Sequence, residues 1–165
     1  MAAEAFLKDG SVESYLGTAL ATALVLGNKH NSKFTQIQAT DFAKHWKVLS
    51  QESSTNTGFS GTLFQCVEDD PATGAKKGEL VISFRSTEFL DDAARDNEAT
   101  NSLEIKDFGF AFGQISDMEA WFKKLKADPL LIPTDQQVSV TGYSLGGHLA
   151  AAFNVVHGAD RTDQG

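Results

Sequence analysis

The chain has little cysteine and no long apolar run. Its 165 residues include one cysteine, Cys66, so no internal disulfide can form and cysteine usage gives no indication of the redox compartment. The longest apolar stretch, residues 19–27, is too short to cross a bilayer, and no transmembrane segment is expected. Acidic residues rather than a basic cluster precede this stretch, so we predict a helix of the mature protein and not a signal peptide.

Positive charge is also scarce. Lysine and arginine number 14 against 22 acidic residues, which gives a formal net charge of −8 and an isoelectric point near 4.9. Such a surface repels phosphates, so no nucleic-acid partner is expected. Hydrophobic content of 41% and charged content of 22% are ordinary for a globular protein, and no repeat or linker divides the chain. We therefore predict a single domain over residues 1–165.

The most informative stretch is residues 138–150, with the sequence VSVTGYSLGGHLA. It is typical of a β-branched strand, a glycine-rich corner and then a helix. Inside it, Gly142, Ser144 and Gly146 form G-x-S-x-G, the nucleophile-elbow pattern of α/β-hydrolases. A serine on such a turn is held exposed as a nucleophile, and glycine is required two residues before and after it because a Cβ would lie too close. The alternative is a plain strand-to-helix turn whose serine caps the helix.

Periodicity and turn residues predict the remaining elements. Strand-like runs at 59–67 and 79–84 flank a hairpin loop at 68–78, and Cys66 is expected to pack within the first run. The second run, a helix at 113–126 and a strand at 137–142 make a strand–helix–strand unit, which implies parallel strands. Helices are also expected at Val12–Leu26, at Asp41–Lys47 with Thr40 as N-cap, and at Leu145–His157.

Residues 88–107 form an acidic irregular segment that has three interpretations. It is a solvated loop, a calcium site without a loop motif of known spacing, or a mobile lid over an apolar pocket. Phe108, Phe110 and Phe112 follow, and they either pack in the core or line an acyl pocket. Apart from this calcium alternative, no metal site or cofactor is expected.

Two pieces of the chain together resemble a known family. Residues 81–88 (VISFRSTE) and 141–150 (TGYSLGGHLA) are similar to the F-R-G-T-E and G-H-S-L-G-G-H-L-A pieces of the class 3 lipase family, within the α/β-hydrolases. Between them, Gln114, Met118 and Trp121 fit the family's Q-x-x-x-M-x-x-W. The bacterial secreted lipases and phospholipases look closest, and the similarity covers roughly residues 59–157. Ser86 and Tyr143 depart from the family's usual glycine and histidine.

The resemblance implies a fold and a chemistry. The fold would be a partial α/β-hydrolase fold, a mostly parallel sheet with flanking helices. Ser144 would be the nucleophile of a serine carboxylic-ester hydrolase, and the backbone N–H groups of Thr87 and Leu145 would form the oxyanion hole. An ester or lipid is the implied substrate, and the implied location is secreted.

The catalytic acid and base of such an enzyme follow the serine in the chain. Only Asp160, Asp163, His148 and His157 follow Ser144 here, on or just beyond the elbow helix. His157 is over three turns from the serine, and His148 is expected to be a packing histidine. We therefore expect the chain to be the N-terminal portion of a longer hydrolase, nearly inactive alone, with the missing C-terminal portion as a partner.

Two other classes of protein stay open at this point. One is a non-catalytic, lipase-like interaction lobe that lacks a working triad. The other is an acyltransferase, which uses the same elbow but excludes water.

Overall fold

The computed structural model describes residues 16–27, 34–52, 55–85, 103–143 and 145–158, with side chains of 103–111 excluded. In chain order the elements are α1 (Gly17–Gly27), α2 (Gln36–His45), β1 (Trp46–Glu52), β2 (Gly61–Cys66), β3 (Leu80–Phe84), α3 (Leu103–Ala127), β4 (Val138–Gly142) and α4 (Leu145–His157). None of these helices is both long and apolar enough to span a bilayer.

The four strands form one sheet in the order β1-β2-β3-β4. The pairs β1/β2 and β2/β3 are antiparallel, and only β3/β4 is parallel. The expected mostly parallel sheet of a partial α/β-hydrolase fold is therefore wrong, because the sheet is small and mixed. The eight residues between β1 and β2 are too few for a parallel crossover, and the thirteen residues between β2 and β3 form turns without a helix, whereas α3 crosses from β3 to β4.

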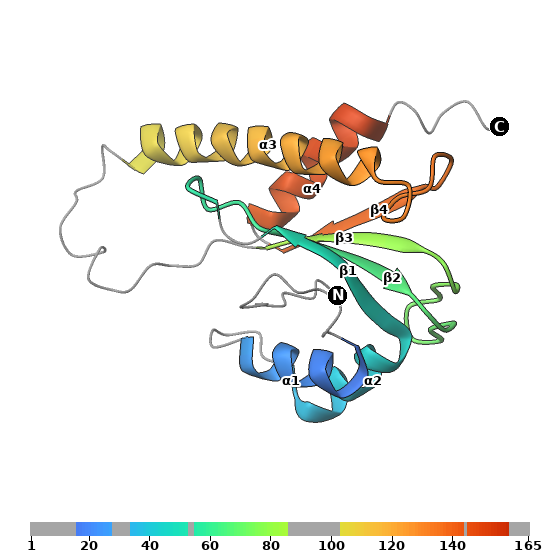
Figure 1. The fold of residues 1–165 in the computed structure, drawn as a ribbon. Coiled ribbons are helices and arrows are strands. Elements are labelled where there is room, and N and C mark those ends of the chain that lie inside the picture. Colours follow the sequence, from blue (N-terminus) through green and yellow to red (C-terminus); the bar gives the residue numbers. More distant parts are fainter. Residues whose placement is uncertain (1–15, 28–33, 53–54, 86–102, 144, 159–165) are drawn as a thin grey trace.

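The helices lie on the two faces of this sheet (Figure 1). α3 and α4 cover one face, and α1 and α2 lie on the other, next to β1. Leu80, Ile82 and Phe84 alternate toward α3 and α4, where they join a fully buried cluster with Met118 and Leu149. The intervening residues of β3 point toward the α1/α2 side.

Several predicted elements are confirmed and others are shifted. The hairpin of β2 and β3, the parallel pairing of β3 with β4, and α4 at Leu145–His157 agree with the sequence predictions. The predicted helix at Asp41–Lys47 is wrong in its bounds, because α2 begins at Gln36. Its N-cap is Thr35, which forms a capping box with Gln38 and leaves Thr40 inside the helix.

The first strand of the sheet, β1, has no counterpart in the sequence predictions. Trp46 falls within the helix predicted at Asp41–Lys47, four residues after Phe42. The two rings do stack, with centroids 5.9 Å apart and planes 15° apart, but Trp46 begins a strand. α3 also begins at Leu103, ten residues earlier than the predicted helix at 113–126.

Candidate functional site

The predicted elbow is the turn between β4 and α4. β4 ends at Gly142 and α4 begins at Leu145, so only two residues separate strand from helix. The Gly146 N–H donates to the Tyr143 carbonyl at 2.9 Å and closes the turn. Tyr143 is exposed, and Leu145 is half-buried at the start of the helix. Ser144, the predicted nucleophile, lies outside the described residues.

The backbone at Gly142 has no room for a side chain. A Cβ built there would lie 2.1 Å from the Gly146 carbonyl oxygen and 2.2 Å from its carbonyl carbon. Real Cβ atoms essentially never approach another atom within 3.0 Å. The strand end and the first turn of α4 are therefore in direct backbone contact, and any larger residue at 142 must push them apart.

Gly146 makes an equally close approach to a different strand. Its Cβ would lie 2.3 Å from the Phe84 carbonyl oxygen, so the first turn of α4 sits on the end of β3. Gly147, the next residue, differs because its nearest neighbour would be 3.5 Å away, an ordinary contact. At both 142 and 146 the backbone therefore leaves no room for a side chain. In the described residues, Gly142 is crowded by the Gly146 backbone, and Gly146 is crowded by the Phe84 carbonyl. The sequence argument expected both glycines to be crowded by the serine instead.

The end of β3 lies beside this turn. Phe84 pairs with Gly142 in the parallel register, and the Arg85 N–H donates to the Ser60 carbonyl at 3.0 Å. The chain therefore leaves β3 next to the start of α4, as the strand–helix–strand prediction requires. Thr87, the predicted first oxyanion residue, lies outside the described residues. The Leu145 N–H, the other predicted donor, belongs to a helix start, where the helix dipole favours negative charge.

The two histidines of α4 lie in different environments. His148 is exposed, so the prediction that it packs is wrong. His157 is the last residue of α4, about 18 Å from its start at 1.5 Å per residue. Its Nε2 lies 2.8 Å from Glu119 Oε1, and its ring lies 4.8 Å from that of Phe122 and 4.6 Å from that of Phe153. His157 is thus held at the far end of the helix. The other candidates, Asp160 and Asp163, lie outside the described residues.

Metal ligands were predicted only for the acidic segment. The part of that segment at 88–102 lies outside the described residues, as do the side chains at 103–107. Elsewhere in the described part of the chain, no group of three or more His, Cys, Asp or Glu side chains could hold a metal ion. Of the three phenylalanines considered for an acyl pocket, only the side chain of Phe112 is described, and it is 71% exposed.

The three α3 residues that match the Q-x-x-x-M-x-x-W pattern have structural roles. Gln114, Met118 and Trp121 are all buried. The Gln114 amide donates to the Thr57 carbonyl at 2.9 Å, which ties the β1–β2 connection to α3. The Thr57 hydroxyl in turn donates to Asp117 at 2.6 Å, and this hydrogen bond lowers the pKa of that carboxyl. The three residues therefore pack α3 against the sheet and against the β1–β2 connection.

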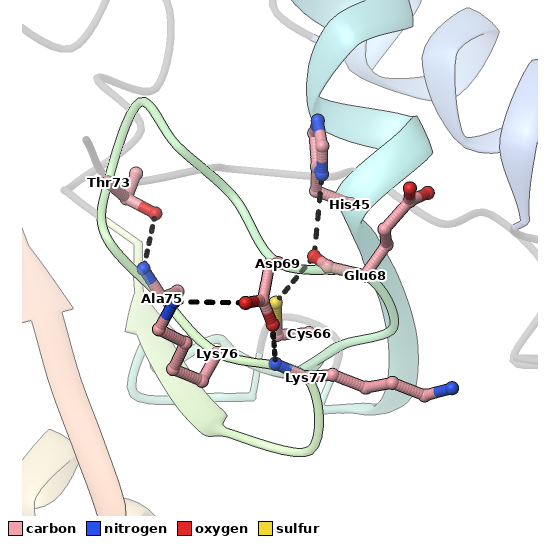
Figure 2. A network of polar contacts seen from close by, with 8 residues as sticks. All are labelled: His45, Cys66, Glu68, Asp69, Thr73, Ala75, Lys76 and Lys77. Atoms are coloured by element: carbon pink, nitrogen blue, oxygen red, sulfur yellow. Dashed lines mark hydrogen bonds and ion pairs between the residues drawn. The ribbon is translucent and has the colours of Figure 1, made fainter.

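A polar network in the connection between β2 and β3 was not predicted (Figure 2). Asp69 accepts hydrogen bonds from the Lys77 N–H and the Lys76 ammonium, both at 2.9 Å, and the first of these is the main reason why its pKa is lowered. The Cys66 thiol donates to the Glu68 carbonyl at 3.0 Å, and the nearest nitrogen of His45 lies 3.4 Å from the same oxygen. Burial raises the pKa of the Cys66 thiol, and its predicted packing within the strand is confirmed.

Asp70 in the same connection is buried and fully engaged. It accepts hydrogen bonds from Trp46 Nε1 at 3.0 Å, from the Thr73 hydroxyl at 2.9 Å and from the Ala72 N–H at 2.9 Å. Burial alone would raise the pKa of Asp70, but these hydrogen bonds outweigh it and the pKa lies below its usual value. The Asp-Pro pair indicates a turn, whereas nothing in the sequence links it to Trp46, 24 residues away.

No family model, curated protein or solved structure matches this chain. The resemblance to class 3 lipases therefore depends on the motifs alone and stays a prediction. What the geometry adds is a physical reason for the two glycines of the elbow motif.

Proposed function

We propose that this protein is a serine carboxylic-ester hydrolase of the lipase or esterase type, with Ser144 as nucleophile. The Ser144 hydroxyl would attack the carbonyl carbon of an ester while a base takes its proton. The alcohol would leave with that proton, and water would then hydrolyse the acyl-enzyme and release the acid. The reaction requires no cofactor.

One observation carries the proposal: glycine is required by backbone contact both two residues before and two residues after the serine. This is the steric demand of a sharp strand-to-helix turn that presents a nucleophile. The contact of Gly146 with Phe84 also brings the end of β3 to the turn. We expect the N–H groups of Thr87 and Leu145 to stabilise the oxyanion there.

The base and the acid that orients it are expected outside the described residues. His157 is engaged with Glu119 at the far end of α4, so it is a poor candidate for the base. His148 lies one helical turn into α4 and is exposed, which makes it the histidine to exclude experimentally.

The test is hydrolysis of p-nitrophenyl butyrate by the full-length protein. We expect Ser144→Ala to lower kcat by at least about 10³-fold, because loss of the nucleophile leaves only binding and oxyanion stabilisation. Ser139→Ala is the matched control, since Ser139 is an exposed serine on the preceding strand, and its activity should be unchanged. Activity that persists in Ser144→Ala would overturn the proposal, because another group would then be the nucleophile. No activity in the unmodified protein would also overturn it and would favour a non-catalytic lobe.

His148→Ala tests the position of the base. If the base lies outside the described residues, this variant retains most of the activity of the unmodified protein. A loss as large as that of Ser144→Ala would place the base on α4 instead.

A further inference from the structure

A cavity of about 420 Å³ lies on the α1/α2 side of the sheet, away from α3 and α4. α2 and the β2–β3 connection form its walls, and the face of β3 and β4 forms its floor. Its volume is within the usual range for small-molecule sites. The aromatic part of its lining consists of Phe34, Phe42, Trp46 and Phe64.

The floor of the cavity carries a buried hydroxyl that the fold does not use. Ser83 lines the cavity and is 3% exposed, and among the described residues its Oγ has no hydrogen-bond partner. Buried hydroxyls without a hydrogen-bond partner are rare in native structures, because leaving such a group unpaired is costly. Thr141 pairs with Ser83 in the parallel register and also lines the cavity. The polar spot therefore lies where the ends of β3 and β4 meet.

The charges around the cavity restrict what it can take. Asp41, Asp70 and Glu79 are among the lining residues, and no lysine or arginine is. Asp70 is stabilised as a carboxylate by its hydrogen bonds, so it adds negative charge at neutral pH. A carboxylate ligand such as a fatty acid anion would meet three like charges, and of the described lining residues only His45 can carry a positive charge. A cation would gain little at these carboxylates, because Asp70 already accepts three hydrogen bonds and Asp41 and Glu79 are exposed to water. The Ser83 hydroxyl can donate or accept a hydrogen bond, and no described residue provides a partner for either.

We propose that this cavity is a binding site for an uncharged molecule with an apolar body and one hydrogen-bond acceptor, such as an ester or an alcohol. The apolar body lies among the aromatic rings, and the acceptor receives the hydrogen bond of the Ser83 hydroxyl. Occupancy of the cavity satisfies the one buried hydroxyl that the described residues leave unpaired. The site does not depend on Ser144 and stands even if the protein is not a hydrolase.

The two tryptophans of the chain offer a direct readout. Trp46 lines the cavity, whereas Trp121 is buried in the cluster on the opposite face of the sheet. Titration of methyl hexanoate into the Ser144→Ala protein, which cannot turn the ester over by the proposed route, should give a saturable change in tryptophan emission. The change should persist in Trp121→Phe and vanish in Trp46→Phe. Either variant alone assigns the signal if the other does not fold.

Two comparisons then test the chemistry. Ser83→Ala should weaken methyl hexanoate binding about 2- to 12-fold, the effect of one hydrogen bond, and Ser83→Cys, a near-isosteric weak donor, should do the same. Ser139→Ala is the control, because Ser139 is a serine of β4 that does not line the cavity. Sodium hexanoate and hexylamine, probes of the same chain length, should each bind at least about tenfold more weakly than the ester.

The proposal is overturned if the folded protein shows no saturable Trp46 signal with methyl hexanoate. It is also overturned if the hexanoate anion or hexylamine binds as tightly as the ester, or if both Ser83 variants bind unchanged. None of these results depends on ester hydrolysis, so they are separable from a failure of the proposed activity.

Discussion

The two faces of the sheet differ in the side chains that cover them. On the α3/α4 face, aromatic side chains interlock, with ring centroids 5.9 Å apart for Phe59 and Trp121 and 4.7 Å apart for Phe122 and Phe153. On the α1/α2 face, an aromatic cluster is present near β1 and β2, but a cavity remains at β3 and β4. The α3/α4 face also has a cavity, of about 600 Å³, where the ends of α3 and α4 meet residues 132–138, but no unpaired buried hydroxyl of the described residues lines it. The cavity on the α1/α2 face is the one that has such a hydroxyl, which is what a ligand site requires.

The largest expected effect is on the packed face. Trp121→Ala should lower the free energy of unfolding by about 3–5 kcal/mol, because a large buried ring is removed from a filled cluster. Leu130→Ala, at a side chain that is 90% exposed, should change it by less than about 0.5 kcal/mol. Urea unfolding followed by circular dichroism gives both values. Equal effects would contradict the packing of Trp121 in this cluster.

The next largest effect is a difference in stability between alanine variants of two neighbouring glycines at the turn. Gly146→Ala should destabilise the protein by about 3 kcal/mol, since its Cβ would overlap the Phe84 carbonyl. Gly147→Ala should be neutral or stabilise by up to about 1 kcal/mol, because its site has room and alanine favours a helix. Thermal denaturation distinguishes them. If Gly146→Ala is tolerated as well as Gly147→Ala, the close crossing of α4 over β3 is not present.

A smaller, pH-dependent effect is expected at the wall of the cavity. Folding lowers the pKa of Asp70 below 3.8, so its carboxylate stabilises the fold above that pH and the stabilisation is lost as pH falls through the folded pKa. At pH 7, Asp70→Asn should lower the free energy of unfolding by about 1–2 kcal/mol, and this difference should shrink below pH 3.8.

The control for Asp70 is Asp41→Asn. Asp41 is exposed and lies 3.5 Å from Lys44, so its replacement should cost less than about 0.5 kcal/mol at pH 7. Urea unfolding at a series of pH values measures both. If the difference in unfolding free energy between Asp70→Asn and the unmodified protein grows toward acid pH, folding does not lower the pKa of Asp70.

The smallest effect compares two serines that are almost equally buried. The Ser60 hydroxyl donates to the Glu52 carbonyl at 2.9 Å, so Ser60→Ala should cost about 1 kcal/mol. Ser83 has no such partner among the described residues, so in the absence of ligand Ser83→Ala should be neutral or slightly stabilising. Chemical denaturation resolves the pair. A cost at Ser83 as large as that at Ser60 would mean that the Ser83 hydroxyl is already satisfied in the fold.

The sequence predicted what short-range patterns encode. The β2–β3 hairpin and α4 follow from turn residues and helical periodicity, and the structure confirms them. The close backbone contacts at Gly142 and Gly146 are consistent with the glycines of the elbow motif. Sheet direction was wrong because it was taken from a resemblance, although the hairpin predicted between the runs at 59–67 and 79–84 already implied an antiparallel pair. The ring stack of Phe42 and Trp46 shows that a four-residue spacing can also arise where a helix ends and a strand begins.

The sequence could not predict the features that depend on long-range contacts. The Trp46–Asp70 hydrogen bond, the cavity and the unpaired Ser83 hydroxyl each join residues from separate elements. The pairing of His157 with Glu119 joins two helices in the same way. No local pattern marks any of these residues, because their positions are set by how the helices dock on the sheet.

The most direct test of the central claim is covalent labelling with a fluorophosphonate probe. In the full-length protein we expect a single adduct within residues 127–161, the tryptic fragment that contains both Ser139 and Ser144. The account predicts that fragmentation places it on Ser144, that Ser144→Ala abolishes it and that Ser139→Ala retains it. An unlabelled protein, or an adduct on any other residue, would contradict the account.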